Sequence, residues 1–352
     1  MSTLTSMMKL SLRAASSLRR TPGVVPALLA LGAAAAVVAF KVKQAERRHP
    51  PAGGFLEVDG VRLHYVDRGL GRPVVFLHGL GSSLEDFRLS GVLERCSEKH
   101  RVIAFDRPGY GYSERPRRHV WTPMAQARLI HRALQRLGIQ RPIVVGHSWG
   151  TLVAASMALQ FPEDVASVVL ASGLYFPSLR PDAPVLASAA IPGIGHLMRV
   201  TLSPLVGRLL WPFSRALLFR PGKVTESFRR YPAWLSLRPR ALRAAAGEAA
   251  LTAPATWAMS SHYAEIAVPT FLVAGDGDRY VHTDEQTGRL HRMLPGSTLR
   301  IAEGAGHVVH HMAPDLVLAA IQSANYAANE ADGAANHAPT RASSPQAAPS
   351  AA

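Results

Sequence analysis

The sequence predicts an α/β protein with a mostly parallel β-sheet that helices cover on both faces. Three observations support this fold class. Short, wholly apolar runs typical of buried strands alternate with longer helix-forming stretches along much of the chain. A serine flanked by glycines lies where one such strand passes directly into a helix. Between about Gly173 and Ala267 the alternation stops, and a proline-rich insertion takes its place.

The first elements are predicted to form a hairpin that makes the antiparallel edge of the sheet. Phe55–Val58 and Val61–Val66 alternate in polarity around Asp59-Gly60, a dipeptide typical of tight hairpin turns. Apolar runs predict the later strands, and the stretches between them predict the helices. The predicted strands are Pro73–Leu77, Val102–Phe105, Ile143–Val145, Val165–Ala171, Val268–Gly275 and Thr298–Ile301, and the predicted helices are Leu84–Ser97, Thr122–Leu137, Leu152–Gln160 and one ending near Ala328.

A nucleophile is predicted at Ser148, in the pentapeptide Gly146-His147-Ser148-Trp149-Gly150. A strand precedes the pentapeptide and a helix follows it, so the serine lies in a sharp strand-to-helix turn. Only glycine-sized residues two positions to either side leave room for so tight a turn. The turn exposes the hydroxyl at the positive end of a helix, where developing negative charge is favoured.

The base that activates Ser148 is predicted to be His307. This histidine follows the strand Thr298–Ile301, and two close glycines before it let the backbone swing its ring toward the serine. His310 and His311 are the competing histidines, and they are expected to begin the helix that follows.

The acid that orients the base is predicted in the loop after Val268–Gly275. Asp276 and Asp278 both lie there. Loops at the carboxyl ends of parallel strands open on the same edge of a sheet, so an acid in this loop can reach the histidine. Spacing alone leaves both aspartates open, because loop aspartates are also common turn formers.

Donors for an oxyanion are predicted in the loop after Pro73–Leu77. Its glycines let backbone amides approach a substrate closely. The two donors are expected to be the amides of Leu80 and of Trp149, the residue after the nucleophile. His78 and Gly79 are expected to lie in the same loop beside the substrate, where His78 holds the loop in shape and is not a second base.

The order of these motifs resembles that of the α/β-hydrolase fold family. The resemblance runs from about Phe55 to Ala328. It rests on His78-Gly79, Asp106-Arg107-Pro108-Gly109-Tyr110-Gly111-Tyr112-Ser113, Gly146-His147-Ser148-Trp149-Gly150, Gly275-Asp276-Gly277-Asp278-Arg279 and Gly306-His307. It is closest to the branch of epoxide hydrolases, haloalkane dehalogenases, cofactor-free haloperoxidases and carbon–carbon bond hydrolases. The resemblance implies an eight-stranded sheet with a helical cap, and it places the acid at Asp278. Ser148 stands where epoxide hydrolases and dehalogenases of this branch carry an aspartate, so those two activities are disfavoured.

The insertion is predicted to be this cap, over residues 174–267, between two parts of the hydrolase core at 51–173 and 268–326. Ten prolines are expected to keep its helices short or broken. From Gly173 to Ala267, eleven Lys and Arg residues stand against four Asp and Glu residues. Two interpretations stay open: an apolar cap core with solvated arginines, or a lid that meets an acidic lipid surface or a long acyl substrate.

Residues 1–50 are predicted to hold a single membrane anchor. Val24–Phe40 is a seventeen-residue apolar run, and no acidic residue occurs before Glu46. Basic residues flank the run on both sides, so the side of the membrane is left open. The flanking residues are Lys9, Arg13, Arg19, Arg20, Lys41, Lys43, Arg47 and Arg48. A cleaved signal peptide and an organellar transit peptide are the alternatives to an anchor.

The remaining features exclude several classes of protein. Residues 327–352 contain few large apolar residues and are predicted to be a disordered tail. The net charge of +15 lies largely in the anchor flanks and the insertion. No zinc finger, helix-turn-helix or basic repeat accompanies it, so no nucleic-acid partner is predicted. The lone Cys96 allows no internal disulfide. No metal or other cofactor is predicted, and the oligomeric state is left open.

Together these features predict a membrane-anchored serine hydrolase. Its substrate is expected to be a small or lipid-like acyl compound with an ester-type bond (carboxylic ester, lactone or thioester), cleaved through an acyl-enzyme. Acyl transfer, carbon–carbon bond hydrolysis and cofactor-free haloperoxidase chemistry are alternatives that use the same Ser148, His307 and Asp278. A ligand receptor on an inactive hydrolase fold is the alternative that is not an enzyme.

Overall fold

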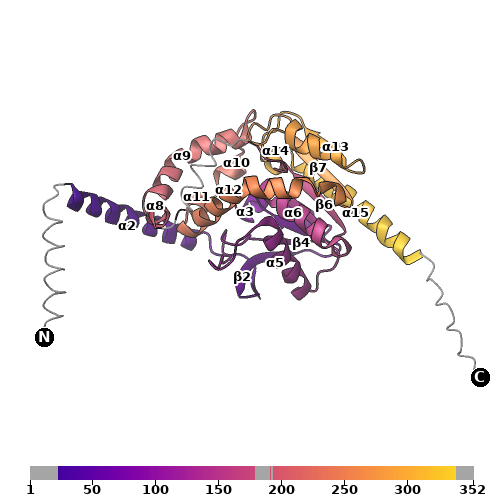
Figure 1. The fold of residues 1–352 in the computed structure, drawn as a ribbon, viewed down its shortest axis with the longest axis horizontal. Helices are drawn as coiled ribbons and strands as arrows, with labels where there is room; N and C mark the ends of the chain where they lie inside the picture. The colour runs from indigo at the N-terminus through magenta and orange to yellow at the C-terminus, as the bar shows by residue number, and fades with distance from the viewer. Residues whose placement is uncertain (1–22, 179–190, 192, 338–352) are drawn as a thin grey trace, which may run out of the picture.

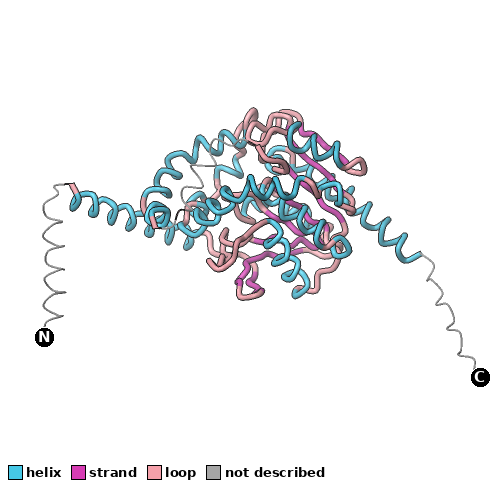
Figure 2. The backbone as a smooth tube through the Cα atoms, viewed as in Figure 1, coloured by secondary structure: helices cyan, strands magenta, loops and turns pink. Residues whose placement is uncertain are grey.

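The structure, a computed structural model, describes residues 23–178, 191 and 193–337. An eight-stranded sheet lies between layers of helices, which confirms the predicted fold class (Figures 1 and 2). The strand order is β1-β2-β4-β3-β5-β6-β7-β8. The first two pairings, β1 with β2 and β2 with β4, are antiparallel, and the other five are parallel. The strands are β1 (Gly54–Val58), β2 (Val61–Arg68), β3 (Pro73–Leu77), β4 (Arg101–Phe105), β5 (Ile143–His147), β6 (Ser167–Ala171), β7 (Thr270–Gly275) and β8 (Thr298–Ala302).

The edge hairpin forms as predicted. Val58 pairs with Val61, and the two residues between them turn the chain. Asp59 has a φ of 51° and Gly60 a φ of 71°, so both lie in the left-handed region that this kind of two-residue turn requires. The Asp-Gly dipeptide fits because both residues tolerate that conformation better than others.

Two separate apolar cores lie on the two faces of the sheet, and β3 contributes to both. Val75 and Leu77 belong to the core under α5, α6 and α13, whereas Val74 and Phe76 belong to the core under α3, α4, α14 and α15. Successive side chains of a strand point to opposite faces, so a strand buried on both sides needs an uninterrupted apolar run. The helices are α3 (Glu85–Leu89), α4 (Val92–Ser97), α5 (Pro123–Arg136), α6 (Trp149–Gln160), α13 (Arg289–Met293), α14 (Val309–Met312) and α15 (Pro314–His337). Short turns of helix complete this part of the chain at η1 (Pro162–Asp164), η2 (Tyr263–Glu265) and η3 (Asp284–Gly288).

Five further helices lie in the described part of the insertion between β6 and β7. They are α8 (Ile194–Val200), α9 (Leu202–Phe219), α10 (Glu226–Arg229), α11 (Ala233–Ser236) and α12 (Pro239–Ser260). The expectation of short or broken helices is wrong for α9 and α12, which continue through Pro212 and Pro254. A proline inside a helix removes one backbone hydrogen bond and bends the helix, and Pro212 lies on an exposed turn where the freed carbonyl can face water.

At the amino-terminal end, α2 (Val24–Arg48) runs past the predicted apolar segment and projects from the body beside α8 and α9 (Figure 1). Its last turns contact α8, α9 and α11, and Val38 and Ala45 are buried there. The preceding basic residues lie outside the described part of the chain. Among the described helices, α2 is the one that is long and apolar enough to cross a membrane, by length and composition.

The carboxyl-terminal helix corrects two predictions. The tail predicted to be disordered from Ala327 is helical as far as His337, because Ala328 is buried and Asp332 pairs with Arg72 and Arg141. Residues 338–352 lie outside the described part. His310 and His311 do not begin this helix, since α14 is a separate turn and α15 begins at Pro314.

Candidate active site

Ser148 occupies a strained turn between β5 and α6. Its φ of 52° and ψ of −121° lie in a region that residues other than glycine rarely adopt, at a cost of about 1–3 kcal/mol. A Cβ atom on Gly150 would lie 2.1 Å from the Leu77 carbonyl oxygen, and one on Gly146 would lie 2.6 Å from the Gly150 oxygen. Both glycines of the pentapeptide are therefore required by close backbone approach, as the sequence predicts.

Three residues from separate loops meet at this turn. His307 Nε2 lies 2.9 Å from Ser148 Oγ, and His307 Nδ1 lies 2.8 Å from Asp278 Oδ2. A carboxylate can only accept, so Nδ1 donates to Asp278 and Nε2 is left to accept the serine proton. The second carboxylate oxygen accepts the backbone N–H groups of Tyr280 and Val281 at 2.9 and 2.8 Å, which fixes the acid in place.

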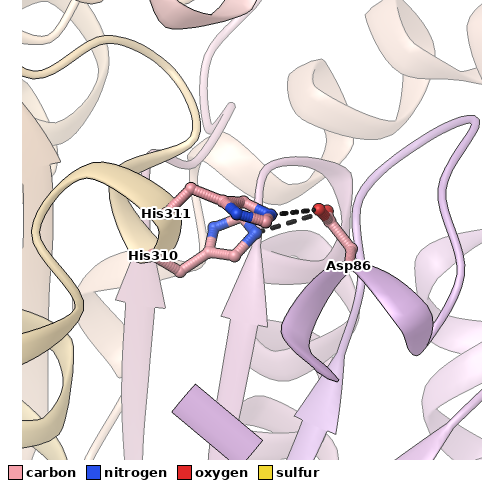
Figure 3. A group of neighbouring side chains, drawn as sticks. All are labelled: Asp86, His310 and His311. Atoms are coloured by element: carbon pink, nitrogen blue, oxygen red, sulfur yellow. Dashed lines mark hydrogen bonds and ion pairs between the residues drawn. The ribbon is translucent and has the colours of Figure 1, made fainter. Parts of the chain in front are cut away.

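The competing residues point elsewhere. Asp276 is exposed, and its Oδ1 accepts the backbone N–H of Gly304 at 2.7 Å, so it ties its own loop to the next one. His310 and His311 face Asp86, on the other side of their helix turn (Figure 3). Among the sequence alternatives, only Asp278 and His307 are brought to Ser148.

The loop after β3 lies against the serine turn. A Cβ atom on Gly79 would lie 3.1 Å from the Cβ of Ser148, so this glycine makes room for the turn. His78 is fully buried: its Nδ1 donates to the Gly79 carbonyl at 2.8 Å, and its Nε2 accepts the Arg107 N–H at 3.0 Å. Burial lowers the pKa of His78 to about 4, so the ring is neutral and holds the loop.

The two predicted oxyanion donors lie at the edges of this arrangement. Leu80 is in the turn that follows Gly79, and Trp149 is the first residue of α6. The first amides of a helix have no carbonyl of their own helix to bond, so the Trp149 N–H is available at the positive end of α6. Both amides therefore belong to the segments that flank Ser148.

A buried ion pair beside the loop is a feature that the sequence did not reveal. Arg107 contacts Glu248 of α12 at 2.6 Å, and both side chains are fully buried. Gln126 and Tyr110 donate to the same carboxylate at 2.9 and 2.7 Å. Arg107 also donates to the carbonyls of His78 and Gly79, so the network joins the insertion to the predicted oxyanion loop. In the sequence, Glu248 stands out only as one acidic residue in an alanine-rich helix.

Asp86, His310 and His311 form a second buried group that the sequence did not predict (Figure 3). The Nε2 atoms of His311 and His310 lie 2.8 and 3.3 Å from the two Asp86 carboxylate oxygens. Burial raises the pKa of Asp86, but the two histidines and their hydrogen bonds outweigh it and hold this pKa well below the usual range. The group joins α3, which follows the β3 loop, to α14, which follows His307.

The donor set of this group, one carboxylate and two imidazoles, is one that transition metals accept, and its ligand atoms lie within 4.8 Å of one another. Metal–ligand bonds of about 2.0–2.1 Å hold neighbouring ligand atoms in a tetrahedral site roughly 3.4 Å apart. The 2.8 Å contact between His311 and Asp86 is shorter than this and is a hydrogen-bond distance. In the present arrangement the group is therefore held by a hydrogen bond between His311 and Asp86, with His310 3.3 Å from the other carboxylate oxygen.

The fold and this site define a member of the α/β-hydrolase fold family, and the chain belongs to it. The sequence profile of that family matches residues 72–314. The chain is 30% identical over 266 residues to the magnesium-chelatase 30 kDa subunit of Rhodobacter capsulatus. The matched region covers 70% of this chain and 84% of that protein. It is 36% identical over 138 residues to a 2-hydroxymuconate semialdehyde hydrolase of Pseudomonas putida, covering 38% and 48% of the two chains.

A third relative is matched over a shorter part. This is the dihydrolipoyllysine-residue acetyltransferase component of the acetoin cleaving system of Cupriavidus necator, 37% identical over 123 residues. The match covers 35% of this chain and spans about a third of that protein (32%).

Solved structures of low sequence identity share the fold. A bacterial membrane phospholipase A superposes with a TM-score of 0.62 at 20% identity, covering 94% of this chain and 99% of that chain. A bromoperoxidase from Bacillus anthracis superposes with a TM-score of 0.63 at 20% identity, and the match covers 78% of this chain and 100% of that chain. A meta-cleavage product hydrolase from Pseudomonas fluorescens superposes with a TM-score of 0.61 at 22% identity, and the match covers 79% of this chain and 98% of that chain. Haloperoxidases and carbon–carbon bond hydrolases are two groups of the branch that the motifs resemble.

Proposed function

We propose that this protein is a serine hydrolase that cleaves carboxylic esters through an acyl-enzyme. The observation that carries the proposal is the continuous hydrogen-bonded chain from Ser148 Oγ through the His307 ring to Asp278. Such a chain lets an imidazole remove the serine proton as the oxygen attacks a carbonyl carbon.

The proposed reaction has two halves. Ser148 Oγ bonds to the carbonyl carbon while its proton passes to His307 Nε2. His307 then gives this proton to the leaving alcohol as the ester C–O bond breaks. Water attacks the acyl-enzyme, its proton passes through the same ring to Ser148, and the carboxylic acid leaves. Asp278 stabilises the imidazolium that forms twice in the cycle.

The developing oxyanion is proposed to bind the backbone amides of Leu80 and Trp149. Gly79 brings the first segment against Ser148, and the start of α6 supplies the second. Fixed donors in a site shielded from water are worth roughly 10²–10³ in rate each. The site is shielded, since only 8% of Ser148 and 3% of His307 is exposed.

The proposed substrate is an uncharged, lipid-like ester. Residues 174–267 are proposed to form a cap, and the end of α9 supports this because the Leu218 carbonyl accepts the His307 N–H at 2.8 Å. The membrane phospholipase A of the same fold and the apolar α2 favour a substrate drawn from a membrane. We further propose that α2 anchors the protein in that membrane.

An active-site fluorophosphonate tests this proposal, followed by a panel of esters of increasing chain length. We expect labelling of wild-type protein, none of Ser148→Ala, and hydrolysis that improves from short to long acyl chains before it levels off. Absence of labelling with intact folding would contradict the nucleophile. Retained ligand binding and unchanged biological output in Ser148→Ala would identify a receptor on this fold instead.

A carbon–carbon bond hydrolase is the second candidate, because the Pseudomonas putida hydrolase is 36% identical over part of the chain. It would use the same serine and histidine to hydrolyse a carbon–carbon bond. Turnover of 2-hydroxymuconate semialdehyde in preference to any ester in the panel would favour this candidate.

A further inference from the structure

A basic hollow of about 230 Å³ lies where the end of α2 meets α9, α10 and α11. None of its lining residues belongs to the Ser148 site. Six of them are cations, and none is an aspartate or glutamate. The cations are Lys41 and Arg48 of α2, Arg208 and Arg215 of α9, and Arg229 and Arg230 at the end of α10.

Most of this positive charge has no ion-pair partner among the residues that the structure describes. Arg229 faces Glu226 at 3.7 Å. Glu46 is the one acidic residue of α2, and it pairs with Arg238 at 2.9 Å. Within residues 23–178, 191 and 193–337, no ion pair is formed by Arg48, Arg208, Arg215 or Arg230. An anion in the basic hollow would therefore meet several guanidinium groups that are free to bind it.

The basic hollow lies at the level expected for lipid head groups. The apolar run of α2 ends at Phe40, and Lys41 is the first residue of the hollow. The seventeen residues from Val24 to Phe40 span about 26 Å as a helix, close to the roughly 30 Å hydrocarbon layer, so Lys41 lies at the membrane surface.

The neighbouring helices present an apolar surface beside the basic residues. The helices α8 and α9 lie beside α2 (Figure 1), and several of their apolar side chains are about half exposed or more. They are Ile194, Leu197, Leu202, Val206, Leu209, Leu210 and Phe213, of which Leu209 is 79% exposed. A surface that mixes such residues with Arg208 and Arg215 has the composition of a helix lying in a membrane interface.

We propose that the basic hollow binds the phosphate of an anionic glycerophospholipid in the membrane that α2 enters. Guanidinium groups bind phosphate oxygens through paired hydrogen bonds. A choline lipid carries the same phosphate with a quaternary ammonium. Trp211, Tyr231 and Trp234 also line the hollow and can contact such a cation, but the six cationic side chains repel it and no carboxylate there balances it. The hollow therefore selects an anionic head group over a zwitterionic one. This inference rests on the proposed membrane position of α2, and it is independent of the chemistry at Ser148.

Native mass spectrometry of the full chain in detergent micelles tests the site. The micelles contain equal amounts of phosphatidylglycerol and phosphatidylcholine with matched acyl chains. We expect one phosphatidylglycerol to be retained with roughly tenfold preference. The Arg208→Gln/Arg215→Gln variant should retain both lipids equally, and Arg208→Lys/Arg215→Lys should keep part of the preference. The matched control, Arg128→Gln/Arg292→Gln, removes two exposed arginines of α5 and α13 and should behave as wild type.

Three outcomes would overturn the proposal. Equal retention of the two lipids by the wild type would show that the hollow selects no anionic lipid. A preference that survives Arg208→Gln/Arg215→Gln would place the selectivity elsewhere. Displacement of phosphatidylglycerol by inorganic phosphate at constant ionic strength would assign the site to soluble phosphate and overturn the lipid assignment. Fluorophosphonate labelling of the same variants reports on Ser148 separately, so failure of one proposal leaves the other to be judged alone.

Discussion

At the scale of single residues, Asp278 has a role that its geometry makes testable. Its carboxylate accepts three hydrogen bonds: one from the His307 ring and two from the backbone N–H groups of Tyr280 and Val281. Only an acceptor at this position holds the His307 ring in the tautomer that can take the serine proton. The neighbouring Asp276 has the same charge but no such contact, which makes it a natural control.

We expect Asp278→Asn to lower kcat for ester hydrolysis by about 10⁴-fold while the fold stays intact. The amide nitrogen can donate to His307 Nδ1, and the ring then carries its proton on the wrong nitrogen. Asp276→Asn should change kcat by no more than a few-fold. Steady-state kinetics on one ester measure kcat of both variants. An equal loss of kcat in the two would show that the charge of the loop matters and that the contact between Asp278 and His307 does not.

His78 gives a pH dependence of stability. Its pKa falls from 6.5 to about 4 in the folded protein, because the ring is buried and lies beside Arg107. The unfolded chain therefore binds more protons than the folded one between these values. The stabilising contribution of His78 is fully present above pH 6.5, and about 3 kcal/mol of it is lost as the pH falls to 4.

We expect the free energy of unfolding of His78→Gln to fall less steeply over this pH range than that of the wild type. Other buried histidines, His147 and His310, also have lowered pKa values and give both proteins the same background slope. Denaturant unfolding in detergent at several pH values measures the difference. Parallel curves for the two proteins would rule out a contribution from His78.

At the scale of elements, the end of α9 is in direct contact with the loop that holds His307. The Leu218 carbonyl accepts the His307 N–H at 2.8 Å. A Cβ atom on Gly306 would lie 2.4 Å from the Arg220 carbonyl oxygen and 2.7 Å from that of Leu218. No side chain fits between these backbones, so the two segments are fixed relative to each other. Because α9 also lines the basic hollow, one helix connects that hollow with the loop that holds His307.

We expect Gly306→Ala to lower kcat by 10²-fold or more, because the new methyl group must displace the His307 loop and lengthen the contact to Ser148. Gly296→Ala is the matched control, since a Cβ atom there meets nothing within 4 Å and its backbone needs no left-handed conformation. The rate of fluorophosphonate labelling, measured beside ester kinetics, reports the reactivity of Ser148 directly. Normal labelling of Gly306→Ala would show that α9 does not constrain the base.

The buried Arg107–Glu248 pair is a second connection between elements. It joins the β4 loop to α12, and breaking such a pair from one side leaves an uncompensated charge, which typically costs 3–5 kcal/mol. The Arg107 guanidinium outweighs the effect of burial and holds the pKa of Glu248 below its usual range. The insertion is thus attached to the core through both α9 and α12.

At the scale of the whole molecule, α2 departs from the globular body. Only its last turns pack on other helices, and its apolar residues are largely exposed. Valine, leucine and phenylalanine side chains along an isolated helix are unfavourable in water and favourable in a bilayer.

We expect the full chain to stay with membranes after carbonate extraction at high pH, because an inserted helix is not released by charge changes. A chain lacking residues 1–40 should be released, or be held only by contacts that salt or carbonate disrupts. Fractionation followed by ester assays of pellet and supernatant measures both proteins. Release of the full chain by carbonate would contradict an inserted α2.

The sequence predicted the fold, and it predicted that the loops holding Ser148, Asp278 and His307 lie at one edge of the sheet. A buried strand, a tight glycine turn and a following helix are local features, and parallel strands bring their carboxyl ends to one edge whatever their order. Spacing alone could not predict which residue is the acid, since Asp276 and Asp278 lie in the same loop. The resemblance to a known family favoured Asp278. The structure places Asp278 on His307.

Other features could not be predicted, because they depend on contacts between residues far apart in the chain. Asp86 lies among the residues of a short helix, and nothing in its neighbourhood indicates that His310 and His311 will reach it. Glu248 finds Arg107 only when α12 folds over the β4 loop. The helical continuation past Ala327 likewise depends on Asp332 meeting Arg72 and Arg141.

The sequence by itself determined the order of strands and helices, the serine turn and the apolar length of the amino-terminal helix, because each follows from backbone conformation and the burial of neighbouring residues. The tertiary structure alone decided which charges are paired and which are left free. Glu46 forms an ion pair with Arg238, whereas Arg208 and Arg215 line a hollow that contains no carboxylate. Charge pairing depends on distance in space, which a list of residues does not contain.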